Sequence, residues 1–198
     1  MTETEWLAAT DPRPMLLLLK GIPKTRKFRL FGVACVNLCI DAADPFRQLA
    51  AVVEHYADDE NPREPFLLRK YPHLGTEHVI AAMALTNEKC DDMAAIHIAS
   101  WVWFQSGAAG VLRGTKILRD IFGNPFRPVA FAPEWRTGTA ASLARGMYES
   151  RDFSAMPILA DALQDAGCDS DDILNHCRDA SATHVRGCWV VDLVLGNE

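Results

Sequence analysis

Helix start and stop signals recur along this chain, and they limit it to a mainly helical fold. Thr2 with Glu5 fits a capping box, and Asp11-Pro12 supplies an N-cap followed by a proline at the first helical position. Similar signals predict helices that begin near residues 26, 44, 76, 92, 110, 140, 157 and 171. Strand signals are few, so the chain is predicted to be all-α, a single compact bundle of about eight or nine helices.

The later helices have predicted bounds of their own. Thr139 is expected to cap a helix over residues 140–149, and Pro157 to open one that Gly167 ends. Ser170 is expected to cap residues 171–178. The last segment, 184–195, is rich in β-branched residues and could form a strand. A helix is preferred there, because a lone strand would have no obvious partner.

The size and composition are those of an ordinary globular protein, with 198 residues of which 49% are hydrophobic and 23% charged. One domain over residues 1–198 is expected, with a possible loop or boundary at 57–75, a region that is polar and rich in proline. The N-terminus is acidic and lacks the pattern of a secretory signal. We therefore expect a cytoplasmic protein with reduced thiols and no membrane span.

Charge is distributed unevenly. Residues 12–40 hold six basic residues and no acidic one, although the chain as a whole has a net charge of −6. Lys24, Arg26 and Lys27 are therefore candidates for binding phosphate or nucleic acid. The pI of about 5.5 argues against a dedicated nucleic-acid binder. The favoured alternative is that this basic segment docks on the Asp-rich residues 161–179, within one chain or between subunits.

Residues 117–129 predict the end of a helix followed by a rigid corner. Gly123 can adopt a positive φ, and Pro125 and Pro128 prevent the helix from continuing. Neighbouring phenylalanines can pack beneath such a turn. A packing role is the favoured interpretation, and Arg127 is the candidate binding residue if the turn has a ligand.

Cysteines and histidines offer a possible metal site. Cys35 and Cys39 are four residues apart, as are His184 and Cys188, so each pair would share one face of a helix. Together they would supply the Cys₃His ligands of a structural zinc site, with His176 and Cys177 as alternates. No C-x-x-C motif is present, so the leading expectation is no cofactor, with zinc as the alternative.

Familiar catalytic motifs are missing from the sequence. The glycine-rich residues 107–116 end in Gly-Thr-Lys, whereas a P-loop requires Gly-Lys followed by Ser or Thr. There is no nucleophile elbow, no His-Glu-x-x-His and no dinucleotide-binding fingerprint. A nucleophile pair of Cys177 and His184 is conceivable, but nothing indicates a stabilised thiolate. Asp161 and Asp165 are best explained as a solvated helix face. The chain is expected not to be an enzyme.

Three longer motifs identify a resemblance. They are the start Met-Thr-Glu-x-Glu-Trp-Leu, the central Leu-Arg-Asp-Ile-Phe-Gly-Asn-Pro-Phe-Arg-Pro-Val at 118–129, and the tail from His184 to Gly196. With these the chain resembles a paralogue-rich bacterial, planctomycete-type family of uncharacterised proteins, over roughly its first 35 and last 80 residues. The resemblance implies a bacterial cytoplasmic setting and no particular chemistry.

The leading functional prediction is an intracellular helical module that binds another macromolecule, a protein partner or a second copy of the chain. Its surface is expected around residues 122–129 and the basic segment. The alternatives are a metalloprotein or enzyme that uses Cys and His residues near the C-terminus, and phosphate or nucleic-acid binding through residues 20–29.

Overall fold

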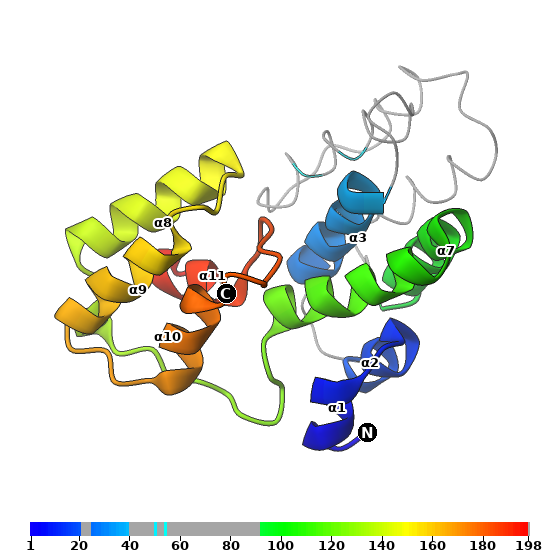
Figure 1. Cartoon of the computed structure of the whole chain (residues 1–198), viewed down its shortest axis with the longest axis horizontal. Helices are drawn as coiled ribbons and strands as arrows, with labels where there is room; N and C mark the ends of the chain where they lie inside the picture. Colours follow the sequence, from blue (N-terminus) through cyan, green and yellow to red (C-terminus); the bar gives the residue numbers. More distant parts are fainter. Residues whose placement is uncertain (21–24, 40–49, 51–53, 55–91, 198) are drawn as a thin grey trace. The chain divides into compact units, whose positions relative to one another are not determined.

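The computed structural model describes residues 1–20, 25–39, 50, 54 and 92–197 (Figure 1). Within these residues all regular secondary structure is helical, which confirms the all-α prediction. Backbone contacts divide the chain into two compact units, Met1–Leu118 and Arg119–Glu198. The single domain stays a prediction, and the expected boundary at 57–75 lies outside the described residues.

The first unit begins with two short helices that the sequence predicted. α1 (Glu3–Ala8) opens with a capping box, in which the Glu5 amide donates to Thr2 Oγ1 and the Thr2 amide donates to the Glu5 carboxylate. α2 (Pro12–Leu18) is capped by Asp11, which accepts from the Arg13 amide. Trp6 and Met15 are fully buried in this unit.

Two longer helices follow. α3 (Thr25–Cys39) begins within one residue of the predicted start near residue 26. α7 (Asp92–Phe122) contains a kink at Gly107, where φ is +61° and ψ is −155°. This break separates the two helices that the sequence predicted on either side of Gly107, because only glycine adopts that conformation readily. None of the helices in the described ranges is long and apolar enough to cross a membrane.

Several sequence predictions fall outside the described residues. They are most of the helix expected to begin near residue 44 and the start of the helix expected near residue 76.

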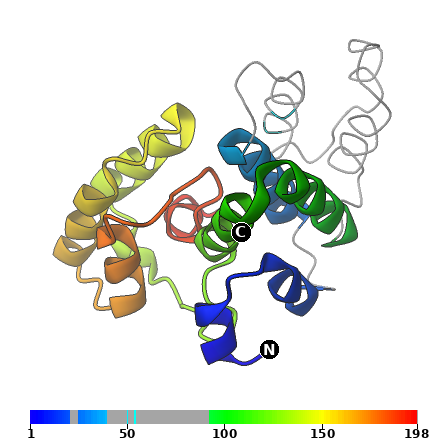
Figure 2. The same ribbon diagram turned by 45° about the vertical axis from the view of Figure 1, so that its right-hand side comes forward.

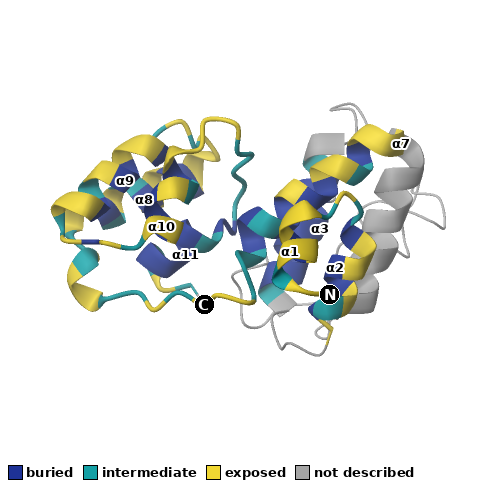
Figure 3. Ribbon diagram, turned by 60° about the horizontal axis from the view of Figure 1, so that its bottom comes forward, coloured by how far each residue is buried: buried dark blue, intermediate teal, exposed yellow. Residues whose placement is uncertain are grey.

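The second unit contains the elements that build the site. They are the 3₁₀ helix η1 (Pro133–Trp135) and the helices α8 (Gly138–Ser150), α9 (Met156–Asp165), α10 (Asp171–Arg178) and α11 (Trp189–Leu195). α9 packs against α8 and α10, and α11 packs against α8 and α10 (Figures 1 and 2). Buried residues line the sides on which these helices meet, and exposed residues lie on the outside (Figure 3).

The core of this unit joins all four helices. It includes Ala144 and Met147 of α8, Leu159 and Leu163 of α9, Ile173 of α10, and Val190, Val191 and Val194 of α11. Complete burial of one such Leu or Ile side chain stabilises a fold by about 1.5–3 kcal/mol. The polar residues near the centre of this unit therefore lie among well-packed apolar groups.

Four predicted helix ends need correction. α8 begins two residues early, because Thr137 and not Thr139 accepts from the Ala140 amide, at 3.2 Å. Pro157 is the second residue of α9 and not the first. Ser170 precedes α10 as predicted, but its side chain makes no capping bond. The predicted helix over 184–195 is confirmed only from Trp189 onward, and the segment before it is a loop.

Candidate metal centre

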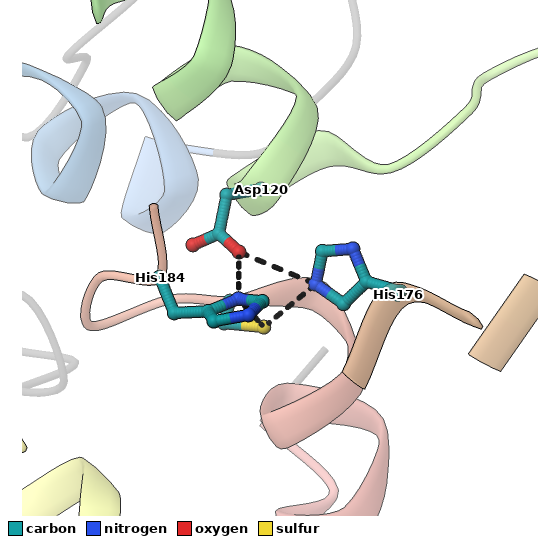
Figure 4. Close-up of side chains that lie close together, drawn as sticks. Asp120, His176 and His184 are labelled. Carbon is teal, nitrogen blue, oxygen red and sulfur yellow. Dashed lines mark hydrogen bonds and ion pairs between the residues drawn. The ribbon is translucent and has the colours of Figure 1, made fainter. Parts of the chain in front are cut away.

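Four side chains of the second unit meet at one point. They are Asp120, His176, His184 and Cys188, whose ligand-type atoms all lie within 4.8 Å of one another. Figure 4 shows the carboxylate and the two imidazole rings turned toward each other and toward a sulfur atom. The part of the chain that the structure describes holds this one group of metal-ligating residues.

Three separate segments deliver these side chains. Asp120 lies in the last turn of α7, two residues before the helix ends at Phe122. His176 lies on α10, next to the buried Cys177. His184 is in the loop that follows α10, and Cys188 is the N-cap residue of α11. The site therefore joins positions that are 64 residues apart, from Asp120 to His184.

The loop from His184 to Cys188 is closed by a tight turn. The Cys188 amide donates to the Val185 carbonyl at 2.9 Å, and Gly187 between them has a φ of +94°. A positive φ at the third residue is the requirement of a type II turn, and glycine meets it without strain. The Arg186 guanidinium lies 4.4 Å from the centre of the Tyr148 ring, a cation–π contact that fixes the loop to α8.

The donor atoms are close enough to share one ion. His184 Nδ1 lies 2.8 Å and His176 Nε2 3.2 Å from Asp120 Oδ1. Cys188 Sγ lies 3.2 Å from His176 Nε2 and 3.9 Å from His184 Nδ1. Ligands at Zn–N and Zn–O distances of about 2.0–2.2 Å and a Zn–S distance of about 2.3 Å stand roughly 3.2–3.8 Å apart in a tetrahedron. A zinc-sized ion would require the 2.8 Å pair to move apart and the longer pairs to move slightly together.

The site is buried. The Asp120 side chain is 3% exposed, the His184 side chain 7% and the His176 side chain 17%. Cys188 is fully buried. Of the four, His176 is thus the residue nearest to solvent, and the ring of Trp189 lies 5.2 Å from its ring.

Burial acts on the pKa of the Asp120 carboxyl and of the two neighbouring thiols, Cys177 and Cys188. It would raise the pKa of Asp120, but hydrogen bonds from His176 and His184 outweigh it, and the pKa of that carboxyl lies below its ordinary value. Burial, together with the charge of Asp120, raises the pKa of Cys188 well above that of a free thiol. Burial likewise raises the pKa of Cys177 to about 12. Neither thiol is therefore an activated nucleophile without a cation beside it.

The geometry also differs from that of a catalytic triad. In a Cys–His–Asp relay one ring nitrogen faces the nucleophile and the other nitrogen faces the carboxylate. Here His176 Nε2 alone faces both Asp120 Oδ1 and Cys188 Sγ. Because both contacts are made by the same nitrogen, the ring does not connect the thiol and the carboxylate through its two nitrogens as a relay does, whereas one cation could be shared by all of these donor atoms.

The sequence indicated half of this group as ligands and one more as an alternate. His184 and Cys188 were candidates, and the structure brings them together, although the predicted cause was wrong because they do not share a helix. His176 was the alternate. Asp120 was missed. Its signal was a single acidic residue flanked by Ile117, Leu118 and Ile121, all fully buried in the structure.

The other predicted metal ligands do not belong to this group. Cys35 is buried in α3 of the first unit, and the side chain of Cys39 lies outside the described residues. Cys177 is buried beside His176 without being one of the four. The predicted site that combines Cys35 and Cys39 with the C-terminal pair stays a prediction, because it joins residues of two units that are described separately.

The candidate binding residues have differing environments. Lys24 lies outside the described residues. Arg26 is half-buried, and Lys27 is 5% exposed, which does not favour a role in attracting a polyanion. Arg127 is exposed. Asp161 and Asp165 are exposed as expected, and Asp161 pairs with Arg178 at 2.8 Å.

The corner at residues 123–127 has the predicted positive φ at Gly123 and lies against Trp189, the residue that follows Cys188. Gly123 has a φ of +66°, and a Cβ atom there would lie 3.3 Å from the Trp189 ring. The Asn124 side chain accepts from the Phe126 amide, and the Arg127 amide donates to the Asn124 carbonyl. Phe126 is 38% exposed at the tip and so does not pack fully beneath the turn. The main packing contact of this corner is thus the one between Gly123 and the Trp189 ring.

Comparisons with known proteins identified no relative of this chain. Neither the protein-family models, nor the curated proteins, nor the solved structures contain a match to this chain.

Proposed function

We propose that the protein is a metalloprotein whose second unit binds one transition-metal ion through Asp120, His176, His184 and Cys188. The observation that carries the proposal is the convergence of their donor atoms on one buried point. The ion would fasten the end of α7, α10 and the loop before α11 to each other. Because that loop has little regular structure of its own, binding energy there becomes folding energy.

The amount of bound metal in the whole chain tests this proposal. Protein loaded with Zn²⁺ and desalted is expected to retain about one ion per chain, because a four-ligand site releases zinc slowly. Cys188→Ser and His184→Ala are expected to weaken zinc binding at least tenfold, as measured by competition with a chromophoric chelator. Cys168→Ser is the matched control, since Cys168 is a buried thiol of the same unit outside the cluster.

Thermal unfolding provides a second measurement. At a free zinc concentration 100 times the Kd, binding to the native state alone adds about 2.7 kcal/mol of stability. Zinc is therefore expected to raise the Tm of the wild type and of Cys168→Ser, and to leave that of Cys188→Ser nearly unchanged. The proposal would be contradicted if the wild-type protein retained no zinc after loading and its Tm were the same with and without zinc.

A second proposal concerns the partner. The corner beside the metal centre presents Phe126, Arg127 and Pro128 at the surface, which supports the role of a helical module that binds another macromolecule. A photo-crosslinking residue in place of Phe126 is expected to capture a protein partner or a second copy, and one in place of the exposed Arg145 on α8 is not. Equal labelling at both positions, or none at either, would contradict this role.

A further inference from the structure

We infer that the centre is a closed, four-coordinate site of the zinc class, in which all ligands come from the protein and no position is left for a substrate. This inference rests on the proposed metal binding and specifies its chemistry. It assigns the ion a structural role, because catalytic zinc sites use three protein ligands and keep the fourth position for water or substrate.

The first argument is the coordination mode of Asp120. Its Oδ2 accepts a hydrogen bond from the Val185 amide at 2.8 Å, and its Oδ1 is the oxygen that faces both imidazoles. The carboxylate is therefore held so that one oxygen points into the centre and the other is occupied by the loop. Asp120 would bind the ion through Oδ1 alone, which gives four ligands and not five.

The second argument is the setting of Cys188. Cys188 is fully buried, and its sulfur lies 3.2 Å from His176 Nε2 and 3.9 Å from His184 Nδ1. One sulfur and two imidazole nitrogens are thus gathered at the same point as the Asp120 carboxylate. Thiolate and imidazole donors select zinc or cobalt over magnesium and calcium, which prefer oxygen.

The third argument is charge balance. When bound to a metal, one carboxylate, one thiolate and two neutral imidazoles would together carry two negative charges, which a divalent ion would neutralise. A neutral complex is the arrangement that a buried site tolerates, because uncompensated buried charge is strongly destabilising. The side chains of Asp120, His176 and His184 are each less than one-fifth exposed. A solvent molecule therefore has little access to the ion as a fifth ligand.

Cobalt substitution of the full-length protein tests the inference. Co²⁺-loaded wild type is expected to show the intense visible bands of four-coordinate cobalt and a near-ultraviolet charge-transfer band from one thiolate. X-ray absorption of the Zn²⁺ form is expected to give one sulfur at about 2.3 Å and three nitrogen or oxygen ligands at about 2.0–2.2 Å. Azide, which binds at open metal positions, is expected to leave the cobalt spectrum unchanged.

Variants then assign the ligands. Cys188→Ser is expected to abolish the charge-transfer band, and Cys168→Ser to keep it. Should Cys188→Ser fail to fold, the wild-type sulfur count and the azide titration still decide the question. Weak visible bands of six-coordinate cobalt, a spectral shift with azide, or displacement of zinc by millimolar Mg²⁺ or Ca²⁺ would overturn the closed site and leave metal binding itself standing. Failure of the chain to retain any metal would instead remove the proposed function.

Discussion

Gly123 lies against Trp189, the residue after the proposed metal ligand Cys188, and replacing Gly123 with alanine tests whether the corner after α7 and the candidate metal centre are coupled. Its φ of +66° disfavours an L-residue, which costs roughly 1–2 kcal/mol. In addition, the new Cβ would lie 3.3 Å from Cγ and Cδ2 of Trp189. Overpacking of this kind costs about 1–3 kcal/mol when the neighbour must shift. Gly123→Ala is therefore expected to destabilise the second unit by about 2–5 kcal/mol.

Two further glycines separate the contributions. Gly167 has a φ of +88° and no atom within 4 Å of the added Cβ, so Gly167→Ala reports backbone strain alone. Gly146 lies inside α8 with open space around the added Cβ. Gly146→Ala is expected to stabilise the helix by about 0.5–1 kcal/mol, because alanine loses less backbone entropy than glycine.

The assay is amide hydrogen exchange of the full-length, zinc-loaded variants. The exchange rates are measured on peptides that cover α9–α11. With about 1.4 kcal/mol for each tenfold change, Gly123→Ala should accelerate exchange roughly 30-fold or more, and Gly167→Ala roughly 5- to 30-fold.

Metal affinity gives a second readout of the same variants. Trp189 follows Cys188 directly and its ring lies 5.2 Å from that of His176, so a displaced indole disturbs two ligands. Loss of such supporting contacts typically weakens metal binding about 10- to 100-fold. Gly123→Ala is expected to fall in that range and Gly167→Ala to retain the wild-type affinity. Indistinguishable exchange and affinity in these two variants would refute the coupling between the corner and the centre.

Other predictions follow from single contacts and are checked by urea denaturation of the full chain. Arg136→Ala removes the hydrogen bonds that the guanidinium donates to the carbonyls of Val194 and Leu193 at 2.8 and 2.9 Å. This change is expected to lower the free energy of unfolding by about 1–3 kcal/mol. A change under about 0.3 kcal/mol would mean that these bonds do not stabilise the fold. Leu163→Ala leaves a cavity at a fully buried position and is expected to lower the free energy of unfolding by about 2–5 kcal/mol. Ile158 is 59% exposed, so Ile158→Ala is expected to have little effect. Equal losses of stability in the two variants would contradict the packing described. Arg178→Ala breaks a solvent-exposed pair with Asp161 and is expected to cost less than about 1 kcal/mol, with an effect that shrinks further in high salt.

The helix starts show how far local chemistry determines this fold. Thr2 and Asp11 were predicted as caps because a hydroxyl or carboxylate next to an apolar run can satisfy the first helical amides, and both do so. Thr137 and Thr139 are chemically equivalent candidates for capping α8. Arg136 binds the end of α11, which fixes the chain just before Thr137. That contact spans 58 residues, so local sequence could not choose between the two threonines.

The metal centre depends on the same distinction between local and distant contacts. His184 and Cys188 are close because a short turn with glycine at residue 187 folds the loop back, and their spacing of four residues predicted the pair even though helical pitch is not the cause. Asp120 reaches them only through the packing of the second unit. Its sequence signal was an acidic residue at a core-facing helix position, where a carboxylate is costly unless something compensates its charge. An acidic residue that shares a helix turn with the apolar Ile117, Leu118 and Ile121 is therefore a signal for a buried partner, although Lys116 and Arg119 are also close to it in the sequence. In this chain two imidazoles and a thiol meet that carboxylate, and the proposed divalent cation would be shared by all four donor groups.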